Sequence, residues 1–377
     1  MMPRVALAGS NNVTSPNFYK SFMKRLLKSI LSERFRRTLR EKYVALSVRH
    51  VHGPKRLRLS ATEAVVTCVV KNGDFYIDAF VDHYTRLGFK HIFFLDNGST
   101  DRTLTLAKRY PNVSICQSHL PIEDFQRIFK KYLALASADG GWVLDVDIDE
   151  FFEYPFSDRI SLPEFISYMN QCGYTAVMTQ MLDVFSDQPL GELLERKHED
   201  IRNTYKYYDL SDISKTPYSG SELAKEYGAQ NQISNGAFSL YYGGIRKTLY
   251  GRNVLLTKHS MFRVGYGVEP FLHVHFVAGA KLADISCTLL HYKLTSNAME
   301  TAIQNKEGFP GNGKGYSDLI DVLVSRPTYV IKSHSSTEYK QVNDLVDNGF
   351  LLVSDQYRLY AERTAEKQVE VATAVSR

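Results

Sequence analysis

The sequence predicts an α/β protein built on a doubly wound, mainly parallel sheet. Between about residues 61 and 147, short apolar runs rich in β-branched residues alternate with amphipathic segments of helical periodicity. This strand–helix order is typical of parallel strands joined by right-handed crossovers. Acidic clusters follow the second and the fourth run, at the strand ends where ligands of such sheets bind. The later sequence is less regular, so we expect an irregular C-terminal half.

The individual elements follow from periodicity and from residues that end helices. The segment from Asp74 to Leu87 predicts a helix that ends at Gly88. A helix with Ser99 or Thr100 as its N-cap should follow, and then a helix around residues 122–136. Residues 204–232 are polar and rich in Tyr, so we expect them at the surface. The expected strands are 65–70, 91–95, 113–116, 142–147, 174–182 and 285–293.

Positive charge is concentrated near the N-terminus. Between Lys20 and Arg58 there are 13 basic and two acidic residues, a net charge of +11, whereas the whole chain carries +5 and the remainder therefore −6. Two interpretations stay open: an amphipathic helix on an anionic membrane surface, or a helix packed on the protein body with a solvated basic face. Nucleic-acid binding is not expected, because no recognition motif accompanies the charge. The apolar residues at helical spacing are Phe22, Leu26, Leu27, Ile30 and Leu31.

We divide the chain into a basic N-terminal arm (1–60), a main domain (61–355) and a C-terminal tail (356–377). The four cysteines are far apart and form no Cys-x-x-Cys pair, which argues against a zinc ribbon or a disulfide framework. No run approaches the roughly 18 apolar residues of a membrane-spanning helix. We therefore expect a cytoplasmic protein, with peripheral contact at the inner face of the plasma membrane through residues 20–58.

The acidic run at residues 145–150 indicates a cation site. Strand alternation would place Val146 and Ile148 on one face and three carboxylates on the other. Converging carboxylates repel one another unless a cation lies between them, and oxygen ligands favour Mg²⁺ or Mn²⁺. An EF-hand loop beginning at Asp145 is excluded, because the Gly and Glu required at its sixth and twelfth positions are missing. The alternative is an exposed strand end with solvated acids.

Several segments together resemble the nucleotide-sugar domain of GT-A-type glycosyltransferases. The nearest branch is family 2, in bacterial members with an Asp-x-Asp-Glu-Phe metal motif. The likeness covers roughly residues 62–355, omits the N-terminal arm, and implies a GT-A-like fold with a Rossmann-like nucleotide-binding half. The segments that carry it are Val-Val-Lys-Asn at 69–72, residues 87–101 with Leu-Asp-Asn-Gly-Ser-Thr-Asp at their end, Trp-Val-Leu-Asp-Val-Asp-Ile-Asp-Glu-Phe-Phe at 142–152, Met181-Leu182-Asp183, Gly243–Lys247, His273–Phe276 and Leu289–Lys293.

The resemblance implies a hexosyltransferase-like enzyme of polysaccharide biosynthesis. It would move a sugar from a nucleotide-diphosphate sugar, a UDP-sugar, to a glycan or lipid-linked acceptor with inversion. Asp96 would accept a hydrogen bond from the donor's base, although it could instead form an Asx turn. Mn²⁺ or Mg²⁺ would be held by Asp147, Asp149 and His291, and this histidine could alternatively be a core residue. The residues expected around the donor nucleotide are Thr67, Lys71, Asn72, Asp96, Ser99 and Asp101.

The catalytic base is less defined, because the chain shows no clear Glu-Asp pair where that family commonly has one. Asp183, at the end of the strand after the metal motif, is our first choice and Glu269 the second. Arg246, Lys247 and His275 could contact a substrate phosphate or the acceptor, or face solvent.

Two other functions stay open. A sugar nucleotidyltransferase would also use a doubly wound sheet and Mg²⁺, but it needs a Gly-rich basic loop after the first strand. Val70-Lys71-Asn72-Gly73 matches such a loop poorly. The other is a non-catalytic membrane-surface protein that binds through its basic arm.

Overall fold

The computed structural model describes residues 33–195, 200–228, 230–308 and 313–375. The chain forms two units, residues 1–46 and 47–377. The first unit is described only through helix α2 (Glu33–Ser47), which continues by one residue into the second. The apolar stripe expected between Phe22 and Leu31 lies outside the described residues.

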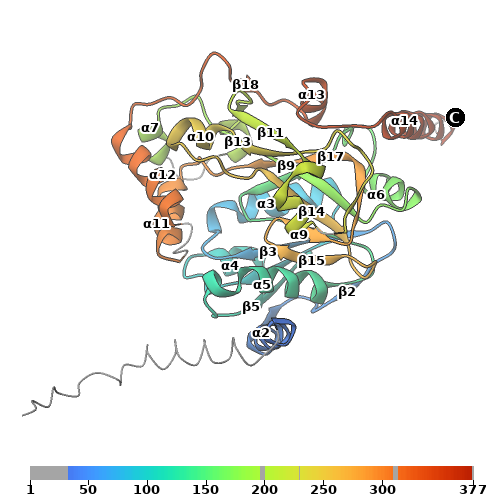
Figure 1. Ribbon diagram of the computed structural model, residues 1–377, viewed down its shortest axis with the longest axis horizontal. Coiled ribbons are helices and arrows are strands. Elements are labelled where there is room, and N and C mark those ends of the chain that lie inside the picture. Colours follow the sequence, from blue (N-terminus) through green and yellow to red (C-terminus); the bar gives the residue numbers. More distant parts are fainter. Residues whose placement is uncertain (1–32, 196–199, 229, 309–312, 376–377) are drawn as a thin grey trace, which may run out of the picture. The chain divides into compact units, whose positions relative to one another are not determined.

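The second unit is built on one large sheet with ten strands among the described residues, in the order β1-β5-β4-β3-β7-β14-β9-β17-β12, with β8 also paired to β17 (Figure 1). Strands β5, β4, β3 and β7 are mutually parallel, as are β9, β17 and β12, whereas β1, β14 and β8 pair antiparallel to their neighbours. The predicted fold class is confirmed. The strands are β1 (Arg49–His52), β3 (Ala64–Val70), β4 (His91–Asp96), β5 (Val113–Gln117), β7 (Trp142–Asp145), β8 (Glu150–Glu153), β9 (Ala176–Asp183), β12 (Gln232–Ile233), β14 (Thr257–Arg263) and β17 (Lys281–His291).

The strand order reverses beside β3. Helices α3 (Asp74–Leu87) and α4 (Thr103–Ala107) connect β3 to β4 and β4 to β5, whereas α5 (Ile122–Ser137) returns the chain to β7 on the other side of β3. Because both directions use right-handed crossovers, α5 covers the face opposite to α3 and α4. The carboxyl ends of β3, β4 and β7 therefore form a crevice at the reversal point, where ligands of doubly wound sheets bind.

Two local expectations were wrong. The N-cap of the helix after β4 is not Ser99 or Thr100 but Arg102. The helix begins at Thr103, whose backbone N–H donates to the carboxylate of Asp101 (2.9 Å). The strand expected to reach Asp147 ends at Asp145, and a turn leads from there into β8. The backbone N–H of Asp147 donates to the Glu150 carboxylate, and that of Glu150 donates to the Asp147 carbonyl, each at 3.0 Å. The carboxylates therefore do not share one strand face.

The second half is irregular, as expected. It adds small two-stranded sheets, β10 (Tyr207–Tyr208) with β18 (Thr337–Glu338), β11 (Ile213–Pro217) with β13 (Ser239–Gly243), and β15 (Glu269–His273) with β16 (Phe276–Ala278). A fourth pair, β2 (Leu57–Arg58) with β6 (Ala138–Asp139), joins the first half. The remaining helices are α6 (Leu162–Gln171), α7 (Leu190–Leu194), α8 (Ile201–Thr204), η1 (Tyr218–Gly220), α9 (Glu222–Tyr227), α10 (Ile245–Tyr250), α11 (Ala298–Gly308), α12 (Gly313–Ser325), α13 (Val342–Asp347) and α14 (Asp355–Val375).

The structure draws the boundaries differently from the expected division at residues 60 and 355. Strand β1 pairs with β5 in the main sheet and β2 pairs with β6. Residues 49–58 therefore belong to the second unit (47–377), called the compact unit below, and not to an arm. Helix α14 occupies most of the expected tail, and its Tyr357 and Ala361 are buried in the core. Figure 1 shows α14 at one end of this unit and α11 with α12 side by side at the other.

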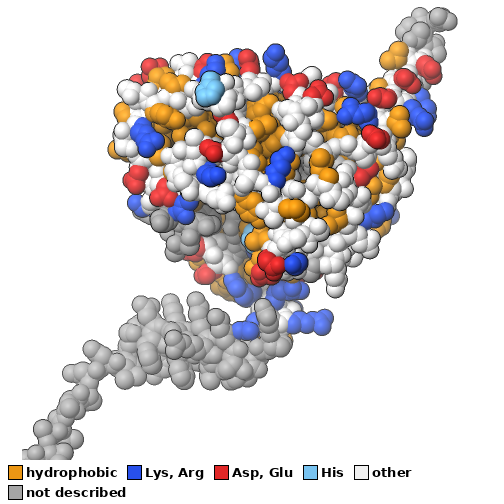
Figure 2. Space-filling model, turned by 45° about the horizontal axis from the view of Figure 1, so that its top comes forward, with side chains coloured by type: hydrophobic (Ala, Val, Ile, Leu, Met, Phe, Trp, Pro, Cys, Tyr) orange, Lys and Arg blue, Asp and Glu red, His pale blue; other side chains and the backbone are white. Residues whose placement is uncertain are grey.

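Three general properties of the chain can be read from the structure: the distribution of surface charge, the state of the cysteines and the polarity of the helices. On the face in Figure 2, basic and acidic side chains of the compact unit are interspersed. All four cysteines carry free thiols. Within the described ranges, the helices are too short or too polar to cross a bilayer.

Candidate active site at the carboxyl edge of the sheet

A cavity of about 380 Å³ opens beside the carboxyl ends of β7, β9 and β17. Strand register builds this edge: His291, the last residue of β17, lies opposite Asp183 on β9 and Glu150 on β8. A larger hollow of about 1010 Å³ lies against α3, α4 and α11, but its charged side chains include exposed ion pairs such as Arg109–Asp78. We therefore place the chemistry in the smaller cavity. Its charged and polar lining residues are Gln126, Lys130, Asp147, Glu150, Arg246, Tyr250, Arg252, Lys258, His273, His275, His291, Lys293 and Tyr316.

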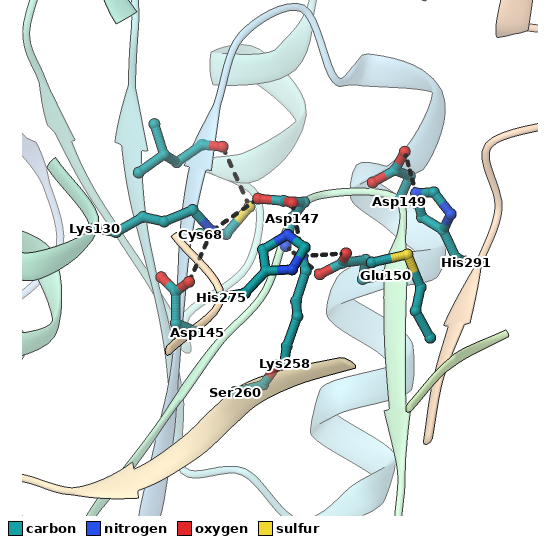
Figure 3. Close-up of polar contacts among 12 residues, drawn as sticks. Cys68, Lys130, Asp145, Asp147, Asp149, Glu150, Lys258, Ser260, His275 and His291 are labelled. Atoms are coloured by element: carbon teal, nitrogen blue, oxygen red, sulfur yellow. Dashed lines mark hydrogen bonds and ion pairs between the residues drawn. The ribbon is translucent and has the colours of Figure 1, made fainter. Parts of the chain in front are cut away.

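Asp147 is held by two buried lysines that approach it from different elements (Figure 3). Lys130 on α5 places its Nζ 2.8 Å from one Asp147 oxygen and 2.7 Å from Asp145, and Lys258 on β14 places its Nζ 3.0 Å from the other Asp147 oxygen. Lys258 also bonds Glu150. The Asp147 side chain is 39% exposed, whereas those of Lys130 and Lys258 are 3% and 6% exposed. Asp147 is thus the carboxylate of this network that opens to the cavity.

The two lysines keep Asp147 ionised. Burial alone would raise the pKa of Asp147, but the ammonium groups of Lys130 and Lys258 hold it well below its ordinary value. Burial would lower the pKa of Lys130, and the carboxylates of Asp145 and Asp147 raise it well above its usual range instead. Burial raises the pKa of Asp145 to about 6 despite the same lysine. Since the two partners lie 2.7 Å apart and this value is still below 7, the Lys130–Asp145 pair is charged at neutral pH.

Asp183 and His291 form a second buried pair. His291 bonds Asp183 through Nδ1, and its Nε2 lies 3.4 Å from the Asp149 carboxylate. Arg246 donates through Nε to the other Asp183 oxygen at 2.8 Å. Burial would raise the pKa of Asp183, but Arg246 and His291 lower it strongly. Asp183 is therefore a weak proton acceptor, and the arrangement instead fixes the His291 ring so that Nε2 faces Asp149.

The other expected substrate contacts divide into two groups. Arg246 and His275 line the cavity. His275 Nδ1 is buried with no hydrogen-bond partner among the described residues, and burial together with Lys258 lowers the pKa of this histidine well below its usual value. Glu269 does not line the cavity; its side chain is 40% exposed and pairs with Lys131 at 2.7 Å. Lys247 is exposed on α10 and also lies outside the lining.

The loops after β3 and β4 are locked together. The backbone N–H groups of Asn72, Gly73 and Asp74 donate to the side chains of Ser99 (2.9 Å), Thr103 (2.7 Å) and Asp101 (3.1 Å), respectively. In return, the side-chain oxygen Oδ1 of Asn72 accepts from the backbone N–H of Thr100 at 2.8 Å. These bonds involve Asn72, Ser99 and Asp101, three of the six residues expected at the nucleotide; Lys71 precedes Asn72 and its side chain is exposed.

The remaining two of those residues are enclosed. Asp96 is fully buried, and its carboxylate accepts from the backbone of Gly98 (3.0 Å) and Ser99 (3.1 Å) and from the side chain of Gln117 (2.8 Å). This is the Asx-turn alternative, in which the carboxylate shapes its own loop. Thr67 is also fully buried, and its hydroxyl donates to Asp145 at 3.3 Å. It therefore helps to hold Asp145, the carboxylate that shares Lys130 with Asp147.

The described side chains alone do not form a metal cage, so a cation held here would need further ligands from a bound nucleotide. Among the described residues, no three His, Cys, Asp or Glu side chains are arranged to hold a metal by themselves. Mg²⁺ in nucleotide sites typically takes one or two carboxylates and completes its shell with water and phosphate oxygens. Asp147 accepts one ammonium on each oxygen, which leaves lone pairs open toward the cavity. His291 is oriented by a carboxylate on its other nitrogen, as metal-bound histidines generally are.

Sequence reasoning did not identify Lys130, Lys258, Arg252 or the cavity tyrosines. A signal existed for Lys130, because it falls three and four residues before the buried Leu133 and Ala134 on the inner face of α5. Lys258 carries no comparable signal, since its role depends on β14 pairing between β7 and β9.

Comparison with known proteins gave fold likenesses only. No protein-family model matches the chain, and a search of curated proteins found no significant match. Glucosyl-3-phosphoglycerate synthase from Mycobacterium tuberculosis, solved with Mn²⁺, uridine diphosphate and glucosyl-3-phosphoglycerate, is 17% identical over 32% of this chain and 44% of its own, with a TM-score of 0.21. A 4-diphosphocytidyl-2C-methyl-D-erythritol synthase is 10% identical over 39% of this chain and 67% of its own, also with a TM-score of 0.21. The chain thus spans less than half of the first enzyme's length, and similarities this low leave the function to be argued from the site.

Proposed function

We propose that this protein is a cation-assisted glycosyltransferase that takes its sugar from a nucleoside-diphosphate sugar. The observation that carries the proposal is the position of Asp147, an ionised carboxylate held by Lys130 and Lys258 and open to a cavity at the crevice of a doubly wound sheet. Buried charges are retained where they serve a site, because desolvating them is unfavourable. The motif resemblance at residues 69–72, 87–101 and 142–152 supports the same assignment. It suggests a UDP-sugar as the donor and a reaction that inverts the configuration of the anomeric carbon.

The residues divide into three tasks. Asp147, Asp149 and His291 would hold Mn²⁺ or Mg²⁺, which supplies neutralisation of charge on the diphosphate leaving group. Lys71 and the locked loops 71–74 and 96–103 would lie beside the bound nucleotide. His275 stays neutral, because burial and Lys258 lower its pKa. It is therefore suited to accept a hydrogen bond from an acceptor hydroxyl, and not to bind a phosphate.

The loop after β3 argues against the nucleotidyltransferase alternative. Such an enzyme needs free backbone N–H groups there to cradle a triphosphate. Here the N–H groups of Asn72, Gly73 and Asp74 already donate to side chains of the β4–α4 loop. The ion network also argues against a non-catalytic protein. Its central carboxylate, Asp147, faces a cavity, whereas a network that only stabilised the fold would not need to be open to one.

The test is hydrolysis and transfer with a panel of nucleotide sugars in the presence of Mn²⁺. We expect release of nucleoside diphosphate from one donor class, and its loss in the Asp147→Ala variant. Release of pyrophosphate from a nucleoside triphosphate and a sugar 1-phosphate would assign the nucleotidyltransferase instead. No turnover and no Mn²⁺-dependent stabilisation with any donor would exclude both enzymes.

We further propose that the first unit contacts an anionic membrane, as suits a lipid-linked or glycan acceptor. On α2 the side chains of Phe35, Leu39, Tyr43 and Leu46 are exposed. They recur at intervals of four, four and three residues and so share one helix face, among basic residues of the same helix.

A further inference from the structure

The cavity contains an ammonium group, Lys293, with no carboxylate of the described residues in contact; Asp149 acts on it only from beyond ion-pair distance. Lys293 follows β17, lines the cavity and is partly buried. Across the described part of the chain, no carboxylate lies within ion-pair distance of its Nζ and no hydrogen-bond acceptor is recorded for it; its near neighbour is the Tyr316 ring, whose centroid lies 4.7 Å away. By contrast, Lys130, Arg246 and Lys258 are each matched to carboxylates.

Further donors without acceptors line the same cavity. Within the residues that the structure describes, no hydrogen bond is recorded for the hydroxyls of Tyr250 and Tyr316, which line the cavity. Arg252 donates through Nε to Asp318 at 2.7 Å, but its Nη2 is buried and makes no hydrogen bond there. The phenol of Tyr250 is a donor at neutral pH, because burial raises its pKa to about 12. Four donors, one of them a full positive charge, therefore lack acceptors around one space.

An anion is the ligand that satisfies this set. A partly buried ammonium and a buried guanidinium N–H without acceptors are unfavourable until a group with several acceptor oxygens arrives. The Tyr316 ring offsets part of the charge of Lys293 but accepts none of its hydrogen bonds. Phosphate and carboxylate oxygens accept charge-assisted hydrogen bonds from lysine and arginine and ordinary ones from phenols.

We propose that Lys293, Arg252, Tyr250 and Tyr316 form a subsite for an anionic group, a phosphate or carboxylate carried by a substrate. It differs from the cation site, which is built on carboxylates. Two sources have this chemistry: the diphosphate of the donor and an acidic group on the acceptor. Only the choice between these sources rests on the proposed function; binding of a free anion does not.

The test uses the full chain and isothermal titration with orthophosphate and with uridine diphosphate. Lys293→Met should weaken binding of the anion by about tenfold or more, the loss expected for a charge-assisted hydrogen bond. Tyr316→Phe, which removes one oxygen and keeps the ring, should weaken it by about two- to tenfold. Lys367→Met and Tyr266→Phe alter exposed side chains elsewhere and serve as matched controls. Thermal unfolding of each variant checks that the fold is intact.

The two probes distinguish the sources. If the donor's diphosphate fills the subsite, Lys293→Met weakens uridine diphosphate binding and leaves uridine binding unchanged. If an acceptor group fills it, uridine diphosphate binds as before, and the variant loses orthophosphate binding measured with saturating uridine diphosphate present. Either result supports the subsite, even if no nucleotide sugar is ever turned over. Folded Lys293→Met and Tyr316→Phe proteins that bind both probes like the wild type overturn it.

Discussion

Lys258 on β14 donates to Asp147, 3.0 Å away, across the boundary between the two halves of the sheet. The acid belongs to the turn after β7, in the parallel half, and the lysine belongs to the antiparallel strand that follows β7 in the sheet order. Because Lys258 also bonds Glu150, one ammonium fixes both ends of the β7–β8 turn. The geometry of the acidic motif therefore depends on a residue more than a hundred positions later in the chain.

Replacing Asp147 or Asp149 by Ala should abolish transfer and cation-dependent donor binding while the protein stays folded. The fold should survive because Lys130 keeps Asp145 and Lys258 keeps Glu150 as partners. Donor binding with and without Mn²⁺ measures the effect, and Asp139→Ala, at an exposed acid, is the control. Undiminished turnover by the wild-type protein in EDTA would exclude the cation role.

Asp183→Asn separates a positioning role from a catalytic one. Loss of the carboxylate that orients His291 should weaken Mn²⁺ affinity by about 10–100-fold, as is typical for groups behind a metal ligand. Titration of Mn²⁺ in the presence of uridine diphosphate measures this. A general base would behave differently: kcat would fall while the affinity for Mn²⁺ stayed constant.

Asp96→Asn should destabilise the protein as well as weaken nucleotide binding. The carboxylate accepts from Gly98, Ser99 and Gln117, and an amide would turn a donor toward one of them. We expect a loss on the order of 1–3 kcal/mol in the free energy of unfolding, measured in urea. If stability is unchanged and only the affinity for nucleoside diphosphate falls, Asp96 contacts the base and does not act mainly through its loop.

Lys130→Met should be strongly destabilising, by about 3–5 kcal/mol, because it leaves Asp145 buried without its partner. The deficit should depend on pH. With Lys130 present the pKa of Asp145 is about 6 in the fold, against about 3.9 when unfolded, and removal of Lys130 raises the folded pKa further because the ammonium lowers it. Both proteins tolerate the neutral acid at low pH, but above pH 6 only the wild type has a partner for the ionised form. The variant should therefore lose more stability at pH 8 than at pH 5, as urea unfolding can show. Adding Asp145→Asn should restore part of the loss at pH 8; no rescue would contradict the pairing.

Removing residues 1–46 should release the protein from anionic vesicles at low salt and leave nucleotide binding intact. Basic residues near such a surface each contribute on the order of 1 kcal/mol within a Debye length. The cut must stop before β1, because residues 49–52 pair with β5 in the main sheet. Vesicle sedimentation measures binding, with neutral vesicles as the control. A truncated protein that still sediments with anionic vesicles would place the contact on the compact unit.

The parallel half of the fold was predictable because each of its elements has a local signature. Apolar runs bounded by glycine or polar residues located β3, β4 and β5, and the strand order alone placed Asp96 and Asp145 at one edge. The turn at residues 146–149 was not predictable from alternation, since an alternating pattern persists whether the backbone stays extended or folds back. What selects the turn is the pair of hydrogen bonds between Asp147 and Glu150.

The composition of the site was predictable only for residues within the motifs. Asp147, Asp149 and His291 stand in segments with a recognisable pattern. Arg252 follows α10 and Tyr316 lies on α12, and no local sequence signal marks either as part of a cavity. Asp183 was correctly placed at a strand end, but its partners come from distant segments: His291 through pairing of β17 with β9, and Arg246 from helix α10. These partners determine its protonation. Such roles follow from tertiary contacts and leave no trace in periodicity.

The insertion of β14 between β7 and β9 has a consequence for biosynthesis. A ribosome that has made the chain only as far as residue 256 has released both flanking strands but not the one that joins them. At elongation rates of about 5–20 residues per second, β7 and β9 keep open edges for several seconds after their own synthesis. Open edges invite pairing with other chains. Nascent-chain folding, rather than the stability of the finished protein, should therefore limit its yield, and fragments ending before Thr257 should aggregate when made alone.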